Sequence, residues 1–312
     1  MADQLSEVLD LVEVYSAVSG GFAARGRWVA RSPCYDAMKL IAMVSGHGRM
    51  LTDGLDEPVE LSAGDVAILN NRTWLRYEGG PQGEGPRHRI SPEENFTGLD
   101  EADPATDDVV LGIAVGINSA GQELLLQTLP PVGVVRATAS APLRTILDQI
   151  FTEVAGRRTG SAFAIRQYGQ LLFLAVLRAY LDQVEAPPGW LRVLTDERLR
   201  PAVALMHNEP AAPWGLEELA RSAAMSRSTF ARHFRAAAGM PPLTYLSRYR
   251  MLLAQRALRQ NDTRIAALAA DLGYASEAAF SNAFKREIGE SPLHYRHRVR
   301  NDPYGRRQPA PA

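Results

Sequence analysis

The sequence predicts an α+β protein of two domains: an N-terminal antiparallel β-barrel with helices, and a C-terminal all-α domain. Three observations lead to this prediction. The 312 residues suffice for two domains. Residues 38–137 hold short apolar runs between Gly and Asp turns, as strands do, whereas later residues repeat apolar positions with a helical period. The charged residues also differ between the two parts. Residues 1–195 hold 16 Lys and Arg and 24 Asp and Glu, whereas residues 196–312 hold 18 Lys and Arg and 11 Asp and Glu.

The charge division gives −8 for the first part and +7 for the second. Such an asymmetry predicts different partners for the two domains, and a basic domain is suited to a polyanion. Cys34 is the single cysteine, which excludes a disulfide within the chain and any multi-cysteine metal site. We expect a buried structural thiol there, with a thiol sensor as the alternative. The residues show no secretory signal and no apolar run of membrane-spanning length, so we expect a cytoplasmic protein with no membrane contact.

The predicted N-terminal elements begin with a helix over residues 5–18. Short strands follow, and they predict a small barrel or sandwich. The predicted strand segments are 38–46, 49–54, 58–71 with a turn at Gly64–Asp65, 73–80, 109–117 and 128–137. Residues 79–108 are rich in Gly, Pro and acids, which predicts a long loop.

Two helices are predicted next, over residues 142–155 and 161–184. In the second, four apolar residues step by three or four positions: Leu174, Leu177, Leu181 and Val184. This stripe is either a packing face inside the domain or a dimer seam. The residues EAPPGW at 185–190 break the helix. We therefore expect domains at residues 1–190 and 196–300, with a flexible tail at 301–312.

The basic half contains an internal repeat. SRSTFARHFRAAAG at 226–239 matches SEAAFSNAFKREIG at 276–289, fifty residues later. The matched pairs are Ser226 with Ser276, Phe230 with Phe280, Phe234 with Phe284, Arg235 with Lys285, Gly239 with Gly289, Pro242 with Pro292, and Tyr245 with Tyr295. A short helix and a turn of small residues precede each copy, so each is predicted to be a helix-turn-helix.

Each repeat predicts a helix that begins after a Ser N-cap and ends at a Gly. The phenylalanines at positions 5 and 9 share one face and are predicted to anchor the helix to the core. The remaining polar face suits a DNA major groove. Residues 242–261 between the copies predict one helix of about 30 Å, close to the roughly 34 Å between successive major-groove faces. A purely structural helical pair remains the alternative.

Residues 196–298 strongly resemble the AraC family of bacterial transcription regulators. The resemblance rests on PWGLEELARSAAMSRSTFARHFRAAAGMPPLTYLSRYRMLLAQRAL and IAALAADLGYASEAAFSNAFKREIGESPLHYR. It implies that the second helix of each unit reads double-stranded promoter or operator DNA. It also implies RNA polymerase and a small-molecule effector as partners, with a homodimer as an option.

The positions that the resemblance implies for DNA contact lie in both repeats. In the first they are Arg227, Ser228, Ala231, Arg232 and Arg235; in the second they are Ser276, Glu277, Ala278, Ser281, Asn282, Lys285 and Arg286. Arg232 is the best candidate for a bidentate contact to guanine. Arg227, Arg235, Lys285 and Arg286 are better suited to phosphate. Small and acidic residues in the second helix predict that it is the weaker reader.

The acidic half is similar to the cupin-type sensor domain of many AraC-family regulators, on LIAMVSGHGRML, VELSAGDVAILN and LLLQTLPPVGVVR. Enzymatic cupins hold a metal with three histidines and a glutamate, but His47 and His88 are the only histidines of this half. We therefore expect no metal and no cofactor, and a surface position for His47. A small barrel can still enclose a ligand. Candidate lining residues are Trp28, Tyr35, Lys39, Trp74, Arg76 and Tyr77, with ordinary packing as the alternative for each.

These observations predict a DNA-binding transcription regulator, not an enzyme, that a small molecule controls through the barrel. Two alternatives remain. The barrel could serve only to dimerise a ligand-independent regulator, or it could be a cupin enzyme fused to a DNA-binding domain. The missing metal ligands argue against the enzyme.

Overall fold

A computed structural model describes residues 4–12, 14–81, 87–91, 98–118, 126, 129–139, 141–183 and 187–301. The chain forms two compact units. The strand-rich unit comprises residues 14–116 and 129–185, and the helical unit comprises residues 1–13, 117–128 and 186–308. Residues 4–12 therefore group with the helices of the C-terminal half, whereas the sequence suggested an N-terminal domain over residues 1–190.

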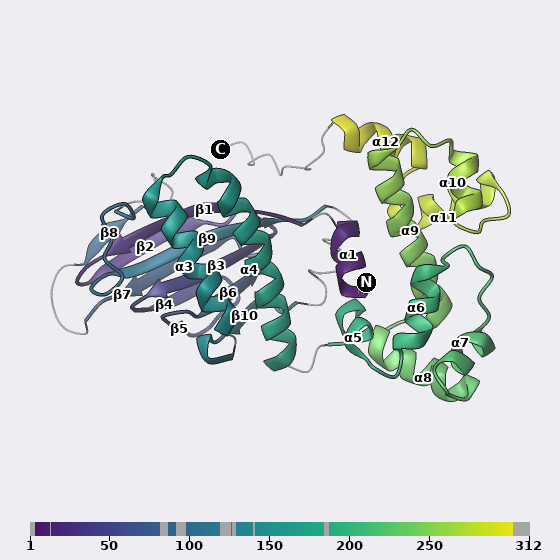
Figure 1. Ribbon diagram of the computed structural model, residues 1–312, viewed down its shortest axis with the longest axis horizontal. Helices are drawn as coiled ribbons and strands as arrows, with labels where there is room; N and C mark the ends of the chain where they lie inside the picture. The colour runs from purple at the N-terminus through teal and green to yellow at the C-terminus, as the bar shows by residue number, and fades with distance from the viewer. Residues whose placement is uncertain are drawn as a thin grey trace. The chain divides into compact units, whose positions relative to one another are not determined.

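The strand-rich unit contains two five-stranded sheets (Figure 1). The first has the order β1 (Tyr15–Ala24), β9 (Asp108–Gly116), β3 (Met38–Ser45), β6 (Val66–Asn70), β10 (Val132–Val135). The second has the order β5 (Val59–Ser62), β4 (His47–Thr52), β7 (Trp74–Gly79), β2 (Trp28–Pro33), β8 (His88–Ile90). All the pairings are antiparallel except that of β2 with β8. This confirms the predicted antiparallel, cupin-like domain.

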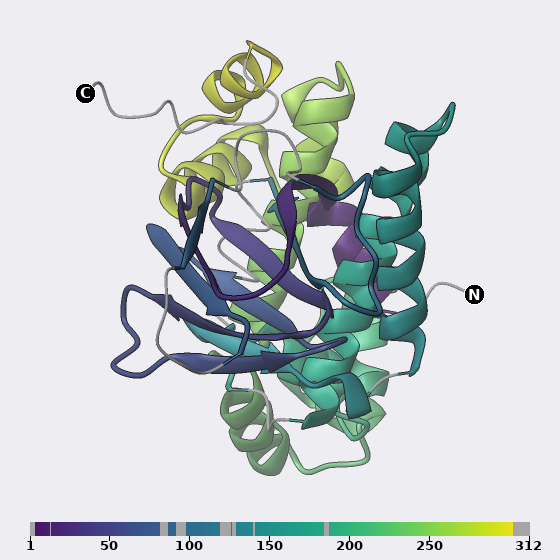
Figure 2. The same ribbon diagram turned by 90° about the vertical axis from the view of Figure 1, so that its left-hand side faces the viewer.

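Side chains from both sheets form one apolar core, which includes Phe22, Trp28, Ile41, Met50 and Tyr77. Two helices, α3 (Ala141–Gly156) and α4 (Ser161–Gln183), pack on strands of the first sheet. Figure 2 shows these teal helices beside the strands. Strand β3 is therefore buried on both faces, which accounts for its nearly continuous apolar sequence.

Two N-terminal predictions were wrong, and one strand was missed. The helix predicted over residues 5–18 ends early, because α1 spans Gln4–Val12 and strand β1 begins at Tyr15. Strand β2 was not predicted. The predicted loop at 79–108 contains β8, which pairs with β2, and its residues 82–86 and 92–97 lie outside the described part of the chain. The later predicted strands and both helices after residue 140 are present.

Among the described residues, the helical unit contains eight helices of the C-terminal half together with α1. They are α5 (Trp190–Thr195), α6 (Arg200–Asn208), α7 (Leu216–Ser222), α8 (Arg227–Ala238), α9 (Pro242–Gln260), α10 (Ile265–Asp271), α11 (Glu277–Ile288) and α12 (Pro292–Asn301). The pairs α7–α8 and α10–α11 are the two predicted helix-turn-helix units, and α9 is the predicted connecting helix. Most of the tail predicted at 301–312 lies outside the described residues.

Helix α1 buries Val8, Leu11 and Val12 and packs against α9 and α5. The guanidinium of Arg259 on α9 donates a hydrogen bond to the Leu11 carbonyl at 3.1 Å. The side-chain amide of Asn118 donates to the same carbonyl at 3.0 Å. Apolar packing and these two hydrogen bonds thus join α1 to the helical unit. None of the described helices is both long enough and apolar enough to span a membrane.

Candidate nucleic-acid interface and barrel pocket

Helices α8 and α11 begin and end in the same way. The Ser226 hydroxyl accepts a hydrogen bond from the Thr229 amide at 3.3 Å, and the Ser276 hydroxyl accepts one from the Ala279 amide at 3.1 Å. Each serine satisfies an amide that the first helical turn leaves without a partner. Both helices end at a left-handed glycine and have 12 residues. The local sequence therefore fixes the same helix length in both repeats.

The phenylalanines of the repeats face inward, as predicted. Phe230, Phe234, Phe280 and Phe284 are each 0% exposed. Within each helix the two rings lie close together, with centroids 5.6 Å apart in α8 and 5.7 Å apart in α11. These buried rings determine which side of each helix points outward.

The outward side of α8 is basic. Arg227, Ser228, Arg232 and Arg235 are exposed, and Ala231 is half-buried. Within the described part of the chain, no ion pair or hydrogen bond engages the side chains of these three arginines. Three solvated guanidinium groups on one short helix suit phosphate and the edges of guanine bases.

The outward side of α11 has a different chemistry. Ser276, Glu277, Ala278, Asn282, Lys285 and Arg286 are exposed, and Ser281 is half-buried. Asn282 occupies the position of Arg232, and Glu277 that of Arg227. An amide suits adenine, whereas a carboxylate repels phosphate, so the two helices offer different contacts.

Helix α9 connects the two helix-turn-helix units, α7–α8 and α10–α11, without interruption. Its 19 residues correspond to about 28 Å at 1.5 Å per residue. The Arg250 guanidinium on α9 donates to the carbonyl oxygens of Pro210 at 2.6 Å and Ala212 at 3.0 Å, which fastens the α6–α7 loop to this helix. The structure thus provides a stiff connector, which is what two helices reading one side of DNA require.

One contact that supports α8 was missed by sequence reasoning. The His233 Nε2 atom lies 2.8 Å from an Asp196 carboxylate oxygen. The other oxygen of Asp196 accepts hydrogen bonds from the Arg198 and Leu199 amides. Asp196 therefore joins α8 to the start of α6. The pair is 37 residues apart, so no local pattern could have indicated it.

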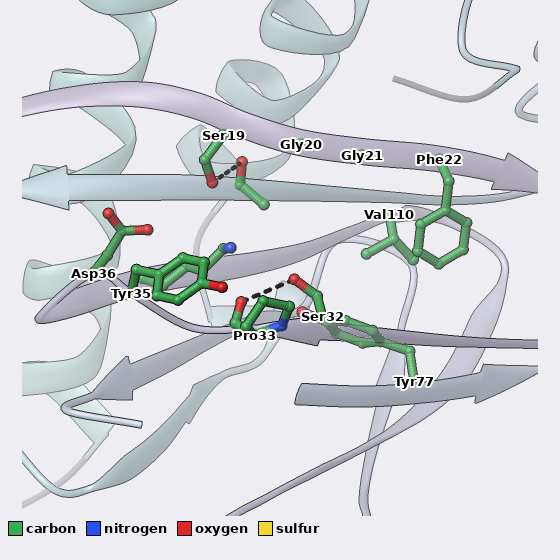
Figure 3. A pocket seen from close by; sticks show the side chains of 12 residues that line it. Ser19, Gly20, Gly21, Phe22, Ser32, Pro33, Tyr35, Asp36, Tyr77 and Val110 are labelled. Carbon is green, nitrogen blue, oxygen red and sulfur yellow. Dashed lines mark hydrogen bonds between the residues drawn. The ribbon is translucent and has the colours of Figure 1, made fainter. Parts of the chain in front are cut away.

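A cavity of about 240 Å³ lies in the strand-rich unit between the two sheets. Figure 3 shows Tyr35 and Asp36 at one end and Phe22 and Val110 at the other. The full lining is Ser19, Gly20, Gly21, Phe22, Ser32, Pro33, Tyr35, Asp36, Lys39, Tyr77, Val110 and Gly112. One end is therefore polar and the other apolar, as in pockets that orient a small ligand.

Three of the six predicted lining residues, Tyr35, Lys39 and Tyr77, line this cavity, and the other three lie elsewhere. Trp28 is 0% exposed in the core, where its indole N–H donates to Asp108 at 2.7 Å. Arg76 pairs with Glu78 at 3.0 Å, and Trp74 lines a separate shallow hollow. The cavity residues that sequence reasoning missed include Ser19, Gly20 and Gly21 of β1, whose small side chains carry no chemical signal of a site.

The comparisons with known proteins agree with this architecture. A family model described as Cupin matches residues 3–182, and one described as Helix-turn-helix domain matches residues 219–298. A protein of Streptomyces lividans, named as an AraC-like transcription regulator, is 33% identical over 299 residues, which cover 94% of this chain and 98% of that protein. The chain belongs to the AraC family.

A second AraC-like relative, from Streptomyces antibioticus, is 34% identical over 304 residues, covering 94% of this chain and 98% of its own. Among solved structures, the DNA-binding domain of AdpA in complex with a target DNA is 36% identical, with a TM-score of 0.33; the match covers 35% of this chain and all of that domain. The helix-turn-helix family model and the two AraC-like relatives identify this AraC-family member as a sequence-specific DNA-binding transcription regulator, and α8 and α11 are its candidate reading helices.

The remaining predicted residues of the AraC-family chain's barrel have ordinary positions. His47 is exposed after the Gly46 turn. Cys34 is buried, and burial raises the pKa of its thiol, so the reactive thiolate is disfavoured. Among the residues that the structure describes, no three His, Cys, Asp or Glu side chains gather as metal ligands would.

Proposed function

We propose that a small molecule bound in the barrel cavity controls how this regulator binds DNA. The observation that carries the proposal is the cavity itself, which combines a polar end with an apolar end inside the cupin domain. A ligand that prefers one state of this domain shifts the population toward that state. The regulated output is contact of the helical unit with an operator and with RNA polymerase.

The proposed division of labour at DNA follows from exposure and charge. Arg232 is exposed near the middle of α8 and reads a guanine by a bidentate contact. Arg227, Arg235, Lys285 and Arg286 bind phosphate and position the two helices. Helix α11 reads fewer bases, because Glu277 and Ala278 stand at its exposed start. The operator then contains one strongly specified half and one weakly specified half.

A ligand-independent regulator with a dimerising barrel is the competing function. On α4, Phe163 and Leu171 are 63% and 50% exposed and offer an apolar surface to a second copy. By contrast, Leu177 of the candidate dimer stripe is 1% exposed, which favours its packing role within the domain. Val184 lies outside the described residues. Sedimentation of the full chain, with Phe163→Ser as the variant, tests the dimer separately from ligand control.

The experiment that tests the proposal begins with genome-wide mapping of the DNA that the regulator occupies. The bound sequence is then used to measure affinity with and without the metabolites that the enzymes of neighbouring genes handle. We expect at least one metabolite to raise the melting temperature and to change operator affinity. If no metabolite changes the operator affinity or the melting temperature, the regulator is ligand-independent and the proposal is wrong.

A further inference from the structure

Lys39 occupies an unusual position for a lysine. It lies on the middle strand of the first sheet, two and four residues before Ile41 and Met43, both members of the core between the sheets. Because strand side chains alternate, Lys39 points to the same side as they do, and it lines the cavity. The residue is only 9% exposed. A buried ammonium is costly unless an anion or several acceptors compensate it.

No compensating ion pair forms inside the described part of the chain. No carboxylate there lies within ion-pairing distance of the Lys39 ammonium, and no hydrogen bond from it is present. Asp36 is the nearby acid, and its attraction to Lys39 acts without direct contact. Burial raises the pKa of Asp36, and the nearby Lys39 opposes this shift. The cavity is therefore lined by a buried lysine that has no direct ionic partner among the described residues.

The backbone beside Lys39 leaves room for a bound ligand. Gly20 on β1 lies opposite Gly112 on β9 in the sheet. A Cβ atom at Gly112 would lie 3.2 Å from the Lys39 Cε atom, so a larger residue would crowd the lysine stem. Ser19 stays at this end of the cavity, and its hydroxyl donates to the Gly112 carbonyl at 3.3 Å. Gly112 thus leaves the lysine stem uncrowded where it lines the cavity.

The other end of the cavity accepts an apolar body. Phe22 and Val110 are 1% and 3% exposed and line it. The Tyr77 ring lies beside Phe22, with centroids 6.3 Å apart. Burial holds the pKa of Tyr77 well above its usual value, so its hydroxyl stays protonated and can donate a hydrogen bond. A guest with one charged end and one apolar end matches this distribution.

We propose that the barrel binds a small organic anion, a monocarboxylate whose charged group pairs with Lys39 and whose apolar body lies against Phe22 and Val110. The inference rests on the proposed ligand control and names the chemistry of the ligand at the same cavity. A carboxylate offsets the buried ammonium, and an uncharged molecule does not. In this proposal, Lys39 alone makes the barrel select anions over uncharged molecules.

The first experiment uses the full chain and matched pairs of probes. Each pair is a monocarboxylate and its primary amide, and the bodies range from acetate through hexanoate and benzoate to phenylpropanoate. We expect at least one carboxylate to raise the melting temperature of the barrel, and its amide to leave it unchanged. The inference is overturned if no carboxylate acts, or if amides act as strongly as their acids.

The second experiment changes the lysine. In Lys39→Met the aliphatic stem is kept and the charge is lost, so we expect an unchanged or higher melting temperature without ligand. The best carboxylate should bind roughly thirtyfold or more weakly, as measured by calorimetry. Lys39→Arg keeps the charge and should retain part of the response. Arg76→Met is the matched control, because that cation lies outside the cavity and pairs with Glu78. Full binding by Lys39→Met would overturn the assignment.

A third measurement separates this inference from ligand control. Operator affinity is measured with the same carboxylate and amide pairs. Binding of a carboxylate with no change in operator affinity would support the anion site and refute ligand control. A change in operator affinity caused only by neutral molecules would support ligand control and refute the anion site.

Discussion

The ring of Phe234 meets the ring of Tyr245 edge to face, with centroids 5.3 Å apart and planes at 78°. Fifty residues later Phe284 meets Tyr295 in the same way, at 5.5 Å and 75°. The repeat is therefore one of packing as well as of sequence, since both helix-turn-helix units fix their second helix with the same pair of rings. Edge-to-face contacts add to the free energy gained by burying the rings.

Phe284→Ala should remove the anchor of α11. The ring is 0% exposed, so the cavity left behind should cost about 3–5 kcal/mol of unfolding free energy. Urea denaturation of the full chain, followed by circular dichroism, measures the loss. Phe284→Leu keeps most of the volume and should cost less. An unchanged midpoint for the alanine variant would show that Phe284 is not a core residue.

Arg232→Ala should weaken binding to the specific site by about 1–3 kcal/mol and relax the base preference at one position. Fluorescence anisotropy with operators substituted at single positions measures both effects. Arg178→Ala is the matched control, since Arg178 is an exposed arginine of α4 in the strand-rich unit. If Arg232→Ala keeps its affinity and preference, α8 does not read bases through this residue.

Arg235→Ala and Lys285→Ala should weaken binding about equally for specific and unrelated DNA. Each removes one proposed phosphate contact, so the slope of log affinity against log salt should fall by about one. Salt titrations of the two variants and the parent measure the slopes. A changed base preference with an unchanged slope would assign these residues to base reading.

Ser276→Ala should destabilise α11 by about 0.5–2 kcal/mol, because the Ala279 amide loses its acceptor. Ser276→Asp restores an acceptor and should recover most of the loss. Ser281→Ala, inside the same helix, is the control for loss of a serine that is not the helix cap. Hydrogen exchange of the first turn of α11 separates the variants, and equal exchange in all three would contradict the cap.

His207 should make the stability of the helical unit depend on pH. Burial lowers the pKa of His207 to about 4, below its usual 6.5, although Glu7 lies 3.5 Å from Nδ1 and the Tyr245 hydroxyl 2.9 Å from Nε2. Between these values the unfolded chain binds a proton that the folded chain excludes. Stability should therefore rise with pH through this window and fall as pH drops, by about 1.4 kcal/mol for each unit.

His207→Gln removes this titration. The difference in unfolding free energy between parent and variant, measured by urea denaturation from pH 4 to 7, isolates the histidine from other acids. Parallel curves for the two proteins would show that His207 titrates normally.

The C-terminal half was predictable because its determinants are local and occur twice. Ser226 and Gly239 bound one helix, and Ser276 and Gly289 bound the other. The N-terminal errors come from partners distant in sequence. Strand β1 is held by β9, and a register shift between Val18 and Gly20 interrupts the alternation that would reveal the strand. The hydrogen bond from Arg259 to the Leu11 carbonyl of α1 joins residues that are 248 positions apart in the sequence.

The candidate cavity was half predictable for a related reason. Residue type identified Tyr77 and Arg76 equally well as candidates, but neighbouring residues of one strand point to opposite sides. Tyr77 pairs with Ala30 and faces the core, whereas Arg76 pairs with Arg31. The pairing of β7 with β2 and β4 decides which of them reaches the cavity, and that pairing is a property of the folded sheet.

Because α1 packs on α9, part of the helical unit can form only after α9 has been translated. Residues 4–12 are translated more than two hundred residues before residues 242–260. At 5–20 residues per second the delay is on the order of tens of seconds. Until then Val8, Leu11 and Val12 lack α9, and of the two partner helices only α5 is translated earlier. The helical unit therefore combines an early and a late segment of the chain, and a ribosome that stops before α9 leaves α1 without this partner.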